Sequence, residues 1–165
     1  MRIPLTDLRR GLNRRRGFTG RTRAEGLRVG DTTVPPEVDV VLDLVLESVH
    51  EGVMVTGTVS GEWRGPCNLC LRPLEGPLVA EVAELFADEP VEGETYAVGR
   101  EFLDTTEMIR DSLLLALPVL ARCPFGGVGR CPNAPDMGTD DTGGSPEVRD
   151  PRWAALDQLR FPEAT

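Results

Sequence analysis

Residues 38–64 read VDVVLDLVLESVHEGVMVTGTVSGEWR, and this stretch decides the fold of the chain. Apolar and polar residues alternate on both sides of a turn at His50-Glu51-Gly52. A period of two is typical of a strand with one buried face, because successive side chains point to opposite faces of a sheet. Two such runs joined by a short turn predict an antiparallel hairpin. Its buried face is expected to hold Val38, Val40, Leu42, Leu44, Leu46, Val53, Val55, Gly57, Val59 and Trp63.

A third strand and one helix are predicted downstream of the hairpin. Residues 66–77 reverse the chain, and residues 78–86 continue the sheet as a three-stranded meander, although their alanines and glutamates leave a helix open. After an acidic loop at 87–101, Asp104 is the expected N-cap of a helix, and Glu107 would complete a capping box. Pro118 is expected to end this helix. Its buried stripe, at helical spacing, is Ile109, Leu113, Ala116 and Leu117.

These elements indicate an α+β fold. We expect an antiparallel sheet that could partly close into a barrel, one packed helix and a short C-terminal helix. At 165 residues the chain fits one domain with tails. The expected segments are an arginine-rich N-terminal part (1–36), an α+β core with the cysteine pairs (37–132), a flexible acidic loop (133–149) and a C-terminal helix with its tail (150–165). The two prolines at 35–36 mark the expected start of regular structure.

Half of the positive charge lies in the first thirty residues, which hold nine of the 18 arginines and only two acidic residues. Arginine offers a planar fork of donors that binds phosphate oxygens in pairs. This segment therefore predicts a polyanionic partner, with RNA, DNA and an anionic membrane surface as candidates. The alternative is that the segment folds back on the acidic remainder of the chain. The candidate phosphate-binding residues are Arg9, Arg10, Arg14, Arg15, Arg16, Arg21 and Arg23.

Four cysteines form two pairs. Cys67 and Cys70 have the C-x2-C spacing that is typical of half a tetrahedral zinc site, and Cys123 and Cys131 flank a glycine-rich turn after the helix. All four could bind one zinc ion and attach the C-terminal segment to the sheet. The alternatives are four ordinary reduced thiols or, with less support, a redox pair.

Other motifs give little indication of catalysis or of export. The sequence has no G-x-S-x-G, P-loop or G-x-G-x-x-G motif, and its one histidine, His50, lies in a predicted turn, so we expect a non-enzymatic protein. No apolar segment follows the arginine-rich start, as a signal peptide would require. The longest apolar run, residues 113–121, is shorter than the roughly 20 residues of a membrane-spanning helix. A cytoplasmic protein without a membrane partner is expected.

Three stretches together resemble a known family. They are Glu51-Gly52-Val53 with the strand leading to Cys67 and Cys70, the segment IRDSLLLALP at 109–118, and DPRWAAL at 150–156. In order and spacing they are similar to the bacterial YceD family, the large ribosomal RNA subunit accumulation proteins, and the Arg9-Arg10-Gly11 region resembles members from high-GC Gram-positive bacteria. Many members carry further cysteines after the helix where this chain has Gly127 and Ala134. A zinc site here would therefore have to be completed by Cys67 and Cys70.

The resemblance implies a non-enzymatic role in the synthesis, processing or stability of large-subunit (23S) ribosomal RNA, and hence in ribosome assembly. The implied partners are ribosomal RNA or a pre-ribosomal particle, with basic ribosomal proteins as further candidates for the acidic surface. The alternative function is an acidic protein-protein adaptor or a zinc-stabilised binding module.

Overall fold

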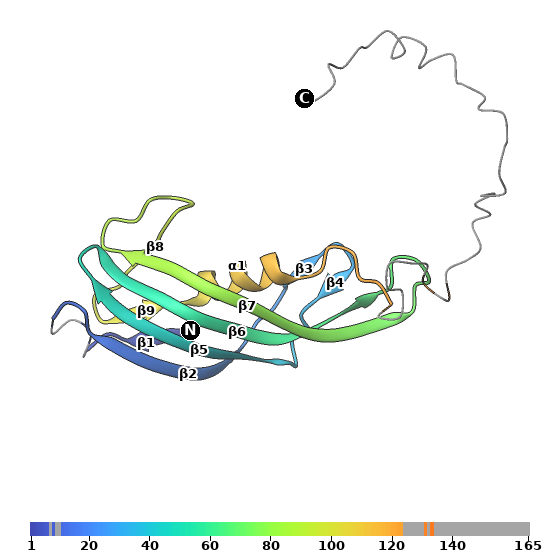
Figure 1. The fold of residues 1–165 in the computed structure, drawn as a ribbon, viewed down its shortest axis with the longest axis horizontal. Coiled ribbons are helices and arrows are strands. Elements are labelled where there is room, and N and C mark those ends of the chain that lie inside the picture. The colour runs from blue at the N-terminus through green and yellow to red at the C-terminus, as the bar shows by residue number, and fades with distance from the viewer. Residues whose placement is uncertain (7, 9–10, 124–130, 132, 134–165) are drawn as a thin grey trace, which may run out of the picture. The chain divides into compact units, whose positions relative to one another are not determined.

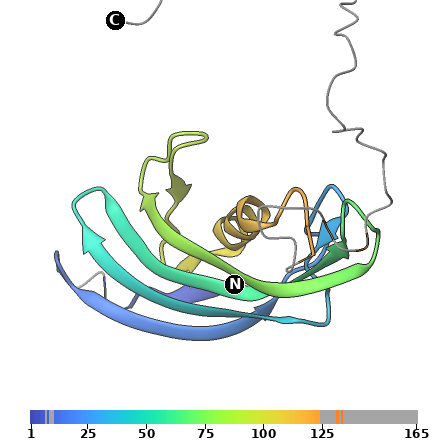
Figure 2. The same cartoon turned by 45° about the vertical axis from the view of Figure 1, so that its right-hand side comes forward.

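A computed structural model describes residues 1–6, 8, 11–123, 131 and 133 of the chain. The main element is a curved sheet, with one helix and a short strand pair on its concave side (Figure 1, Figure 2). The elements in chain order are β1 (Arg2–Pro4), β2 (Arg15–Arg23), β3 (Arg28–Val29), β4 (Thr32–Thr33), β5 (Asp39–Val49), β6 (Gly52–Pro66), β7 (Pro73–Ala87), β8 (Tyr96–Ala97), β9 (Phe102–Asp104) and α1 (Thr106–Ala116).

The predicted meander is confirmed as β5, β6 and β7. Strands β5 and β6 are antiparallel, with Val49 opposite Gly52 across the expected turn. Strand β7 is antiparallel to β6 over its whole length, so the helical alternative for residues 78–86 is wrong. The reason lies in alternation: Leu78, Ala80, Val82 and Phe86 share the buried face, which a period of two permits and a helical period does not.

The β6–β7 hairpin is longer than its neighbour β5. Its strands pair from Gly52 opposite Ala87 to Pro66 opposite Pro73, whereas β5 reaches along β6 only to Ser60. Beyond that point β4 takes over the same edge of β6, with Thr33 opposite Arg64. The tip of the hairpin, which contains the C-x2-C turn, is therefore carried past the end of β5.

The expectation that regular structure begins after Pro36 is wrong. Strand β2 pairs with β5 along its full length, from Arg15 opposite Glu47 to Arg23 opposite Asp39. Its sequence hides this, because Phe18 is the only large apolar side chain in it, and pairing depends on the edge that β5 offers. The closed-barrel option is also wrong: in the described part of the chain β2 pairs with β5 alone, and the sheet stays open.

The core lies on the concave face of the sheet, under α1 and the β1–β9 pair (Figure 2). Helix α1 packs against β7 and β6. Every second residue of β5 from Val40 to Leu46 is fully buried, as the alternation predicted. The other main core residues are Ile3, Leu5, Leu8, Val55, Val59, Phe86, Leu103, Met108, Ile109, Leu113 and Leu117.

Helix α1 begins slightly later than predicted. Thr105 is its N-cap residue, and the Asp104 carboxylate accepts a hydrogen bond from the Thr106 N–H at 3.1 Å. The Asp104 side chain thus satisfies one of the free N–H groups at the helix start from one residue further back. At the other end Leu117 is extended and Pro118 follows, so the predicted stop is confirmed.

Two expectations on the C-terminal part fall on residues that lie outside the described structure. They are the acidic loop at 133–149, of which only residue 133 is described, and the helix and tail at 150–165. Among the described residues, no helix has the length and apolar character needed to cross a membrane.

The close approach of β5 to β6 at Gly57 can be tested by substitution. Its φ is 140°, and a Cβ atom there would lie 2.1 Å from the Asp43 carbonyl oxygen. We expect Gly57→Ala to lower the free energy of unfolding by about 2–4 kcal/mol in urea titrations. Gly61→Ala on the same strand is the control, because its Cβ would meet its nearest neighbour at 3.9 Å. Equal stability of the two variants would contradict this packing.

Asp104 is expected to make stability depend on pH. The Thr106 hydroxyl and N–H lower the pKa of its carboxyl from 3.8 to about 2. A carboxyl with a lowered folded-state pKa stabilises the protein above its unfolded pKa, and this contribution is lost as the pH falls through the folded pKa. Asp104→Ala should therefore cost about 0.5–1 kcal/mol at pH 7. The difference from the wild type should shrink between about pH 4 and pH 2 in denaturation curves, and a constant difference would contradict this role.

Candidate metal centre and arginine-bearing strand

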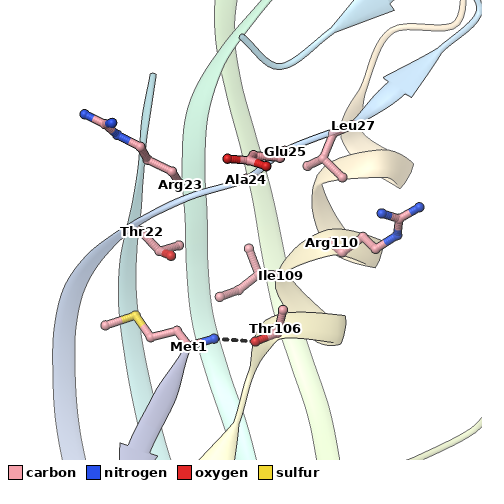
Figure 3. A pocket seen from close by; sticks show the side chains of 9 residues that line it. All are labelled: Met1, Thr22, Arg23, Ala24, Glu25, Leu27, Thr106, Ile109 and Arg110. Carbon is pink, nitrogen blue, oxygen red and sulfur yellow. Dashed lines mark hydrogen bonds between the residues drawn. The ribbon is translucent and has the colours of Figure 1, made fainter. Parts of the chain in front are cut away.

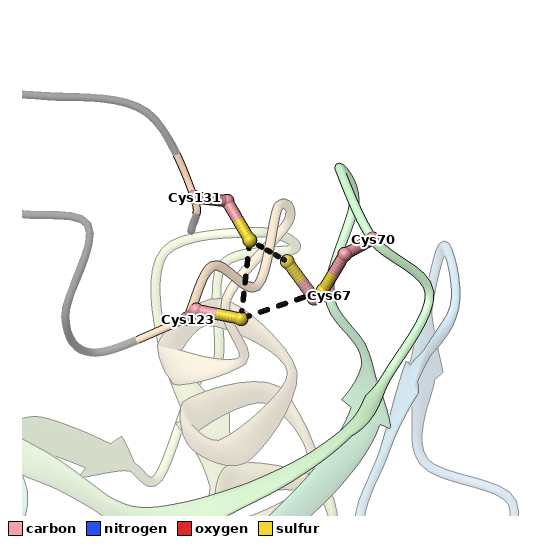
Figure 4. A group of neighbouring side chains, drawn as sticks. All are labelled: Cys67, Cys70, Cys123 and Cys131. Carbon is pink, nitrogen blue, oxygen red and sulfur yellow. Dashed lines mark hydrogen bonds between the residues drawn. The ribbon is translucent and has the colours of Figure 1, made fainter. Parts of the chain in front are cut away.

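The first cysteine pair lies in the turn at the tip of the β6–β7 hairpin. The turn is closed by two backbone hydrogen bonds, from Cys67 N–H to the Arg72 carbonyl oxygen at 2.7 Å and from Leu71 N–H to the Cys67 carbonyl oxygen at 2.9 Å. Leu71 has a φ of 59°, in the left-handed region. This tight reversal turns the side chains of Cys67 and Cys70 towards one point (Figure 4).

The second pair comes from the chain after α1. Pro118 ends the helix, and the chain then passes the hairpin tip, where the Ala121 carbonyl oxygen accepts a hydrogen bond from the Asn68 N–H at 2.9 Å. This contact places Cys123 beside the turn, and Cys131 completes the group (Figure 4). The structure therefore brings together all four cysteines that the sequence analysis selected.

The four sulfur atoms fit a single tetrahedral ion. All lie within 4.8 Å of one another. The Sγ–Sγ distances are 3.3 Å for Cys123–Cys131, 3.5 Å for Cys70–Cys123 and 3.9 Å for Cys67–Cys131. A tetrahedron with Zn–S bonds of about 2.3 Å has sulfur–sulfur edges of about 3.8 Å. These Sγ–Sγ distances are much longer than the S–S bond of a disulfide, which is about 2.05 Å. All four cysteines are therefore free thiols.

The electrostatics of the group favour a cation. The backbone N–H groups of Cys70 and Leu69 lower the pKa of Cys67 to about 6, which favours its thiolate, the form that binds metal. The pKa of Cys123 is raised, first by the thiols of Cys131 and Cys70 and then by burial. Ionised sulfurs this close repel one another, and a divalent cation would remove that repulsion.

Few apolar residues in the described part of the chain pack against the four cysteines. Cys67, Cys123 and Cys131 are buried in a cluster separate from the main core, and among the described residues only Cys70 and Leu74 pack against it as partly buried apolar residues. The apolar surface that these described residues bury on the cluster contributes little free energy. A bound ion would supply the missing free energy.

The arginine-rich segment is part of the sheet. Alternation along β2 places Arg15, Arg21 and Arg23 on the exposed convex face, while Arg16 and Phe18 turn inwards and are half-buried. The side chains of Arg15, Arg21 and Arg23 keep 70%, 74% and 68% of their surface exposed. Sequence reasoning selected these residues but missed the strand, which fixes which of them share a face.

These arginines pair with carboxylates of β5 without being buried. Arg15 lies 2.9 Å from Glu47, its partner across the strands. Arg21 and Arg23 share Asp39, at 4.0 and 3.6 Å. The two alternatives from the sequence, an arm reaching outward and an arm folded on the acidic body, therefore each describe a part of this arrangement.

The other selected arginines have different positions. Arg14 precedes β2 and is exposed. Arg16 donates a hydrogen bond to the Pro4 carbonyl oxygen at 3.2 Å, which attaches β2 to the β1–β9 pair. Arg9 and Arg10 lie outside the described residues. Of the arginines selected from the sequence, Arg14, Arg15, Arg21 and Arg23 are thus the exposed ones in the described chain.

A small hollow of about 130 Å³ lies between the end of β2 and the start of α1 (Figure 3). Its apolar lining includes Leu27 and Ile109. The guanidinium groups of Arg23 and Arg110 at its rim point away from one another (Figure 3). Glu25 is the one carboxylate among the described residues that line it. His50 lies elsewhere, exposed in the β5–β6 turn.

Comparison with known proteins gives one family. The sequence profile described as large ribosomal RNA subunit accumulation protein YceD matches residues 55–160. This region includes all four cysteines and excludes β2. No solved structure matches the chain significantly.

Curated relatives come from mycobacteria. Proteins of Mycobacterium tuberculosis (strain ATCC 25618 / H37Rv) and Mycobacterium bovis are 39% identical over 132 residues, which is 74% of this chain and 63% of theirs. A protein of Mycobacterium leprae is 30% identical over 129 residues, covering 74% of this chain and 59% of its own length. All three are described as uncharacterized proteins. This chain thus spans less than two thirds of the relatives it matches.

We expect the purified full chain to contain about one zinc ion per molecule by elemental analysis, because four thiolates complete a tetrahedral site. The double variant C67S/C131S should lose the ion. Strong chelators should lower the melting temperature of the wild type by ~5 °C or more, since a structural zinc contributes several kcal/mol. The variant is the control and should not respond to chelators. The site would be excluded if the purified wild type contained no zinc and its melting temperature did not change when chelator was added.

Proposed function

Because this chain belongs to the YceD family of large ribosomal RNA subunit accumulation proteins, we propose that it is a non-enzymatic cytoplasmic factor supporting synthesis, processing or stability of 23S ribosomal RNA. Its partner is the RNA itself or a pre-ribosomal particle. The observation that carries the proposal is the family match together with an exposed row of arginines on one edge of the sheet. The family match supports a role in the accumulation of large-subunit ribosomal RNA, and the exposed arginines support direct contact with RNA phosphates.

The ion pairs on β2 leave the arginines available to phosphate. Exposed pairs of this kind are worth only about 0.2–1 kcal/mol each. Asp39 pairs with both Arg21 and Arg23, so its single negative charge balances only one of these two positive charges. Phosphate contacts also gain free energy from counterion release, which an internal carboxylate does not provide. An RNA backbone can therefore displace Asp39 and Glu47 at small cost.

The strand also spaces the contacts. Arg21 and Arg23 project from one face two residues apart, which corresponds to about 6.6–6.8 Å along an extended chain. Arg15 lies on the same face at the other end of β2. A rigid row of guanidinium groups suits backbone contact over several phosphates, with little readout of bases.

The cysteine cluster has a structural role in this proposal. Four thiolates would complete the coordination of zinc and leave no position open for water or substrate. Such a site stabilises a fold and does not by itself activate a nucleophile. Zinc at Cys67, Cys70, Cys123 and Cys131 would connect the hairpin tip to the segment after α1.

RNA binding is tested by its salt dependence. We expect affinity for 23S rRNA fragments to fall steeply between low and moderate salt in filter-binding or anisotropy titrations. The triple variant R15Q/R21Q/R23Q should reduce the slope of log K against log salt by about 2, because about 0.7–0.9 is lost for each phosphate contact. The control R100Q/R110Q/R122Q removes the same charge from exposed positions outside β2 and should keep most of the slope.

The same two variants test the role in cells. Loss of the protein is expected to lower the amount of 23S relative to 16S rRNA. The control variant should restore the ratio, and R15Q/R21Q/R23Q should not. A wild-type affinity that does not change with salt would contradict phosphate contact, and an unchanged rRNA ratio without the protein would contradict the proposed function.

A further inference from the structure

A groove of about 660 Å³ lies between α1, the end of β7 and the loop that leads to β8. These elements are at the opposite edge of the sheet from β2 (Figure 1). The apolar wall of the groove is formed by the last turns of α1, where Leu114 is half-buried and Leu115 is 88% exposed. Leu115 is the most exposed of the large apolar side chains in the described part of the chain.

Carboxylates surround this apolar wall. Glu107 and Asp111 lie on α1, Glu84 on β7, and Glu92 and Glu94 on the loop. Among the described residues, none of the five has an arginine within 4.0 Å. The groove therefore differs from β2, where arginines form ion pairs with carboxylates of β5.

The rim of the groove is held in place. Thr95 fixes the loop, since its N–H donates to the Val91 carbonyl oxygen at 3.0 Å and its hydroxyl accepts from the Val91 N–H at 2.8 Å. The Tyr96 hydroxyl donates to Asp111 at 3.0 Å and ties the loop to α1. Burial and the Asp111 hydrogen bond, with the nearby charges of Glu84 and Glu107, raise the pKa of Tyr96. This is consistent with a negative potential across the groove.

We propose that this groove docks a basic segment of a protein partner, with an apolar side chain against Leu114 and Leu115 and arginine or lysine side chains against the carboxylate rim. Charge complementarity identifies the occupant, because five carboxylates that have no arginine within 4.0 Å among the described residues repel a nucleic acid and attract a polycation. The exposed leucine adds the apolar anchor that a purely acidic surface would lack. This surface does not depend on the RNA contact of β2 and goes beyond it.

Binding is tested on the full chain with a labelled peptide of repeated Arg-Arg-Leu units, followed by fluorescence anisotropy. We expect the double variant E84Q/E94Q to raise the dissociation constant about two- to thirtyfold, since it removes two exposed ion pairs with the peptide. The control E81Q/E89Q alters the same strand and the same loop by the same charge, but neither residue lines the groove. This control should change the dissociation constant less than about twofold.

The apolar anchor is tested separately. Leu115→Ser should weaken the peptide about threefold or more, while Leu120→Ser, which is 62% exposed outside the groove, should not. Equal effects of the groove and control variants, or equal binding of a matched Glu-Glu-Leu peptide, would overturn the proposal. Sedimentation showing self-association that E84Q/E94Q abolishes would assign the groove to a second copy and also overturn it. Binding of 23S rRNA by E84Q/E94Q should stay at the wild-type level, so failure here leaves the RNA proposal separately testable.

Discussion

Backbone pairing along β6 is the constraint on which the rest of the structure depends. This strand pairs with β7 on one side and with β5 and then β4 on the other. Because a sheet alternates its side chains with a fixed period, a slip of β6 by one residue would turn the core residues of this strand to the solvent face. The register therefore fixes three things at once: the apolar face under α1, the place of the C-x2-C turn at the hairpin tip, and the position of Glu84 at the groove.

The tip of the β6–β7 hairpin and the segment after α1 lie against each other at the four cysteine side chains. The main core does not include the cysteine cluster, whose partly buried apolar neighbours in the described part of the chain are Leu74 and Cys70. One backbone hydrogen bond, from Asn68 to Ala121, brings the segments together, and the four sulfurs then lie close enough for one ion. Metal coordination would turn a weakly packed contact into a fixed junction, because its free energy is added only in the folded state.

Charge is distributed unevenly over the domain. At one edge of the sheet, arginines of β2 face carboxylates of β5 in weak, exposed pairs that a phosphate can replace. At the other edge, carboxylates around Leu115 have no such partners among the described residues. In the proposed function, two edges of opposite character would let the protein contact RNA at one edge and a basic protein segment at the other.

The sequence by itself determined the hairpin of β5 and β6, the stripe and stop of α1, and the C-x2-C pair, while it left a helix open for residues 78–86 and did not decide whether the two cysteine pairs meet. These features depend on local patterns: a period of two in residues 38–49 and 52–64, a helical period ended by Pro118, and the C-x2-C spacing. Only the tertiary structure decided that β2 is a strand, since its residues are polar on both sides of Phe18 and its pairing is supplied by the distant β5. The acidic groove was equally hidden, because Glu84, Glu94 and Glu107 belong to three different elements that only the folded chain brings together. Long-range contacts have no periodic signature along the chain, and for this reason they appear only once the sheet has formed.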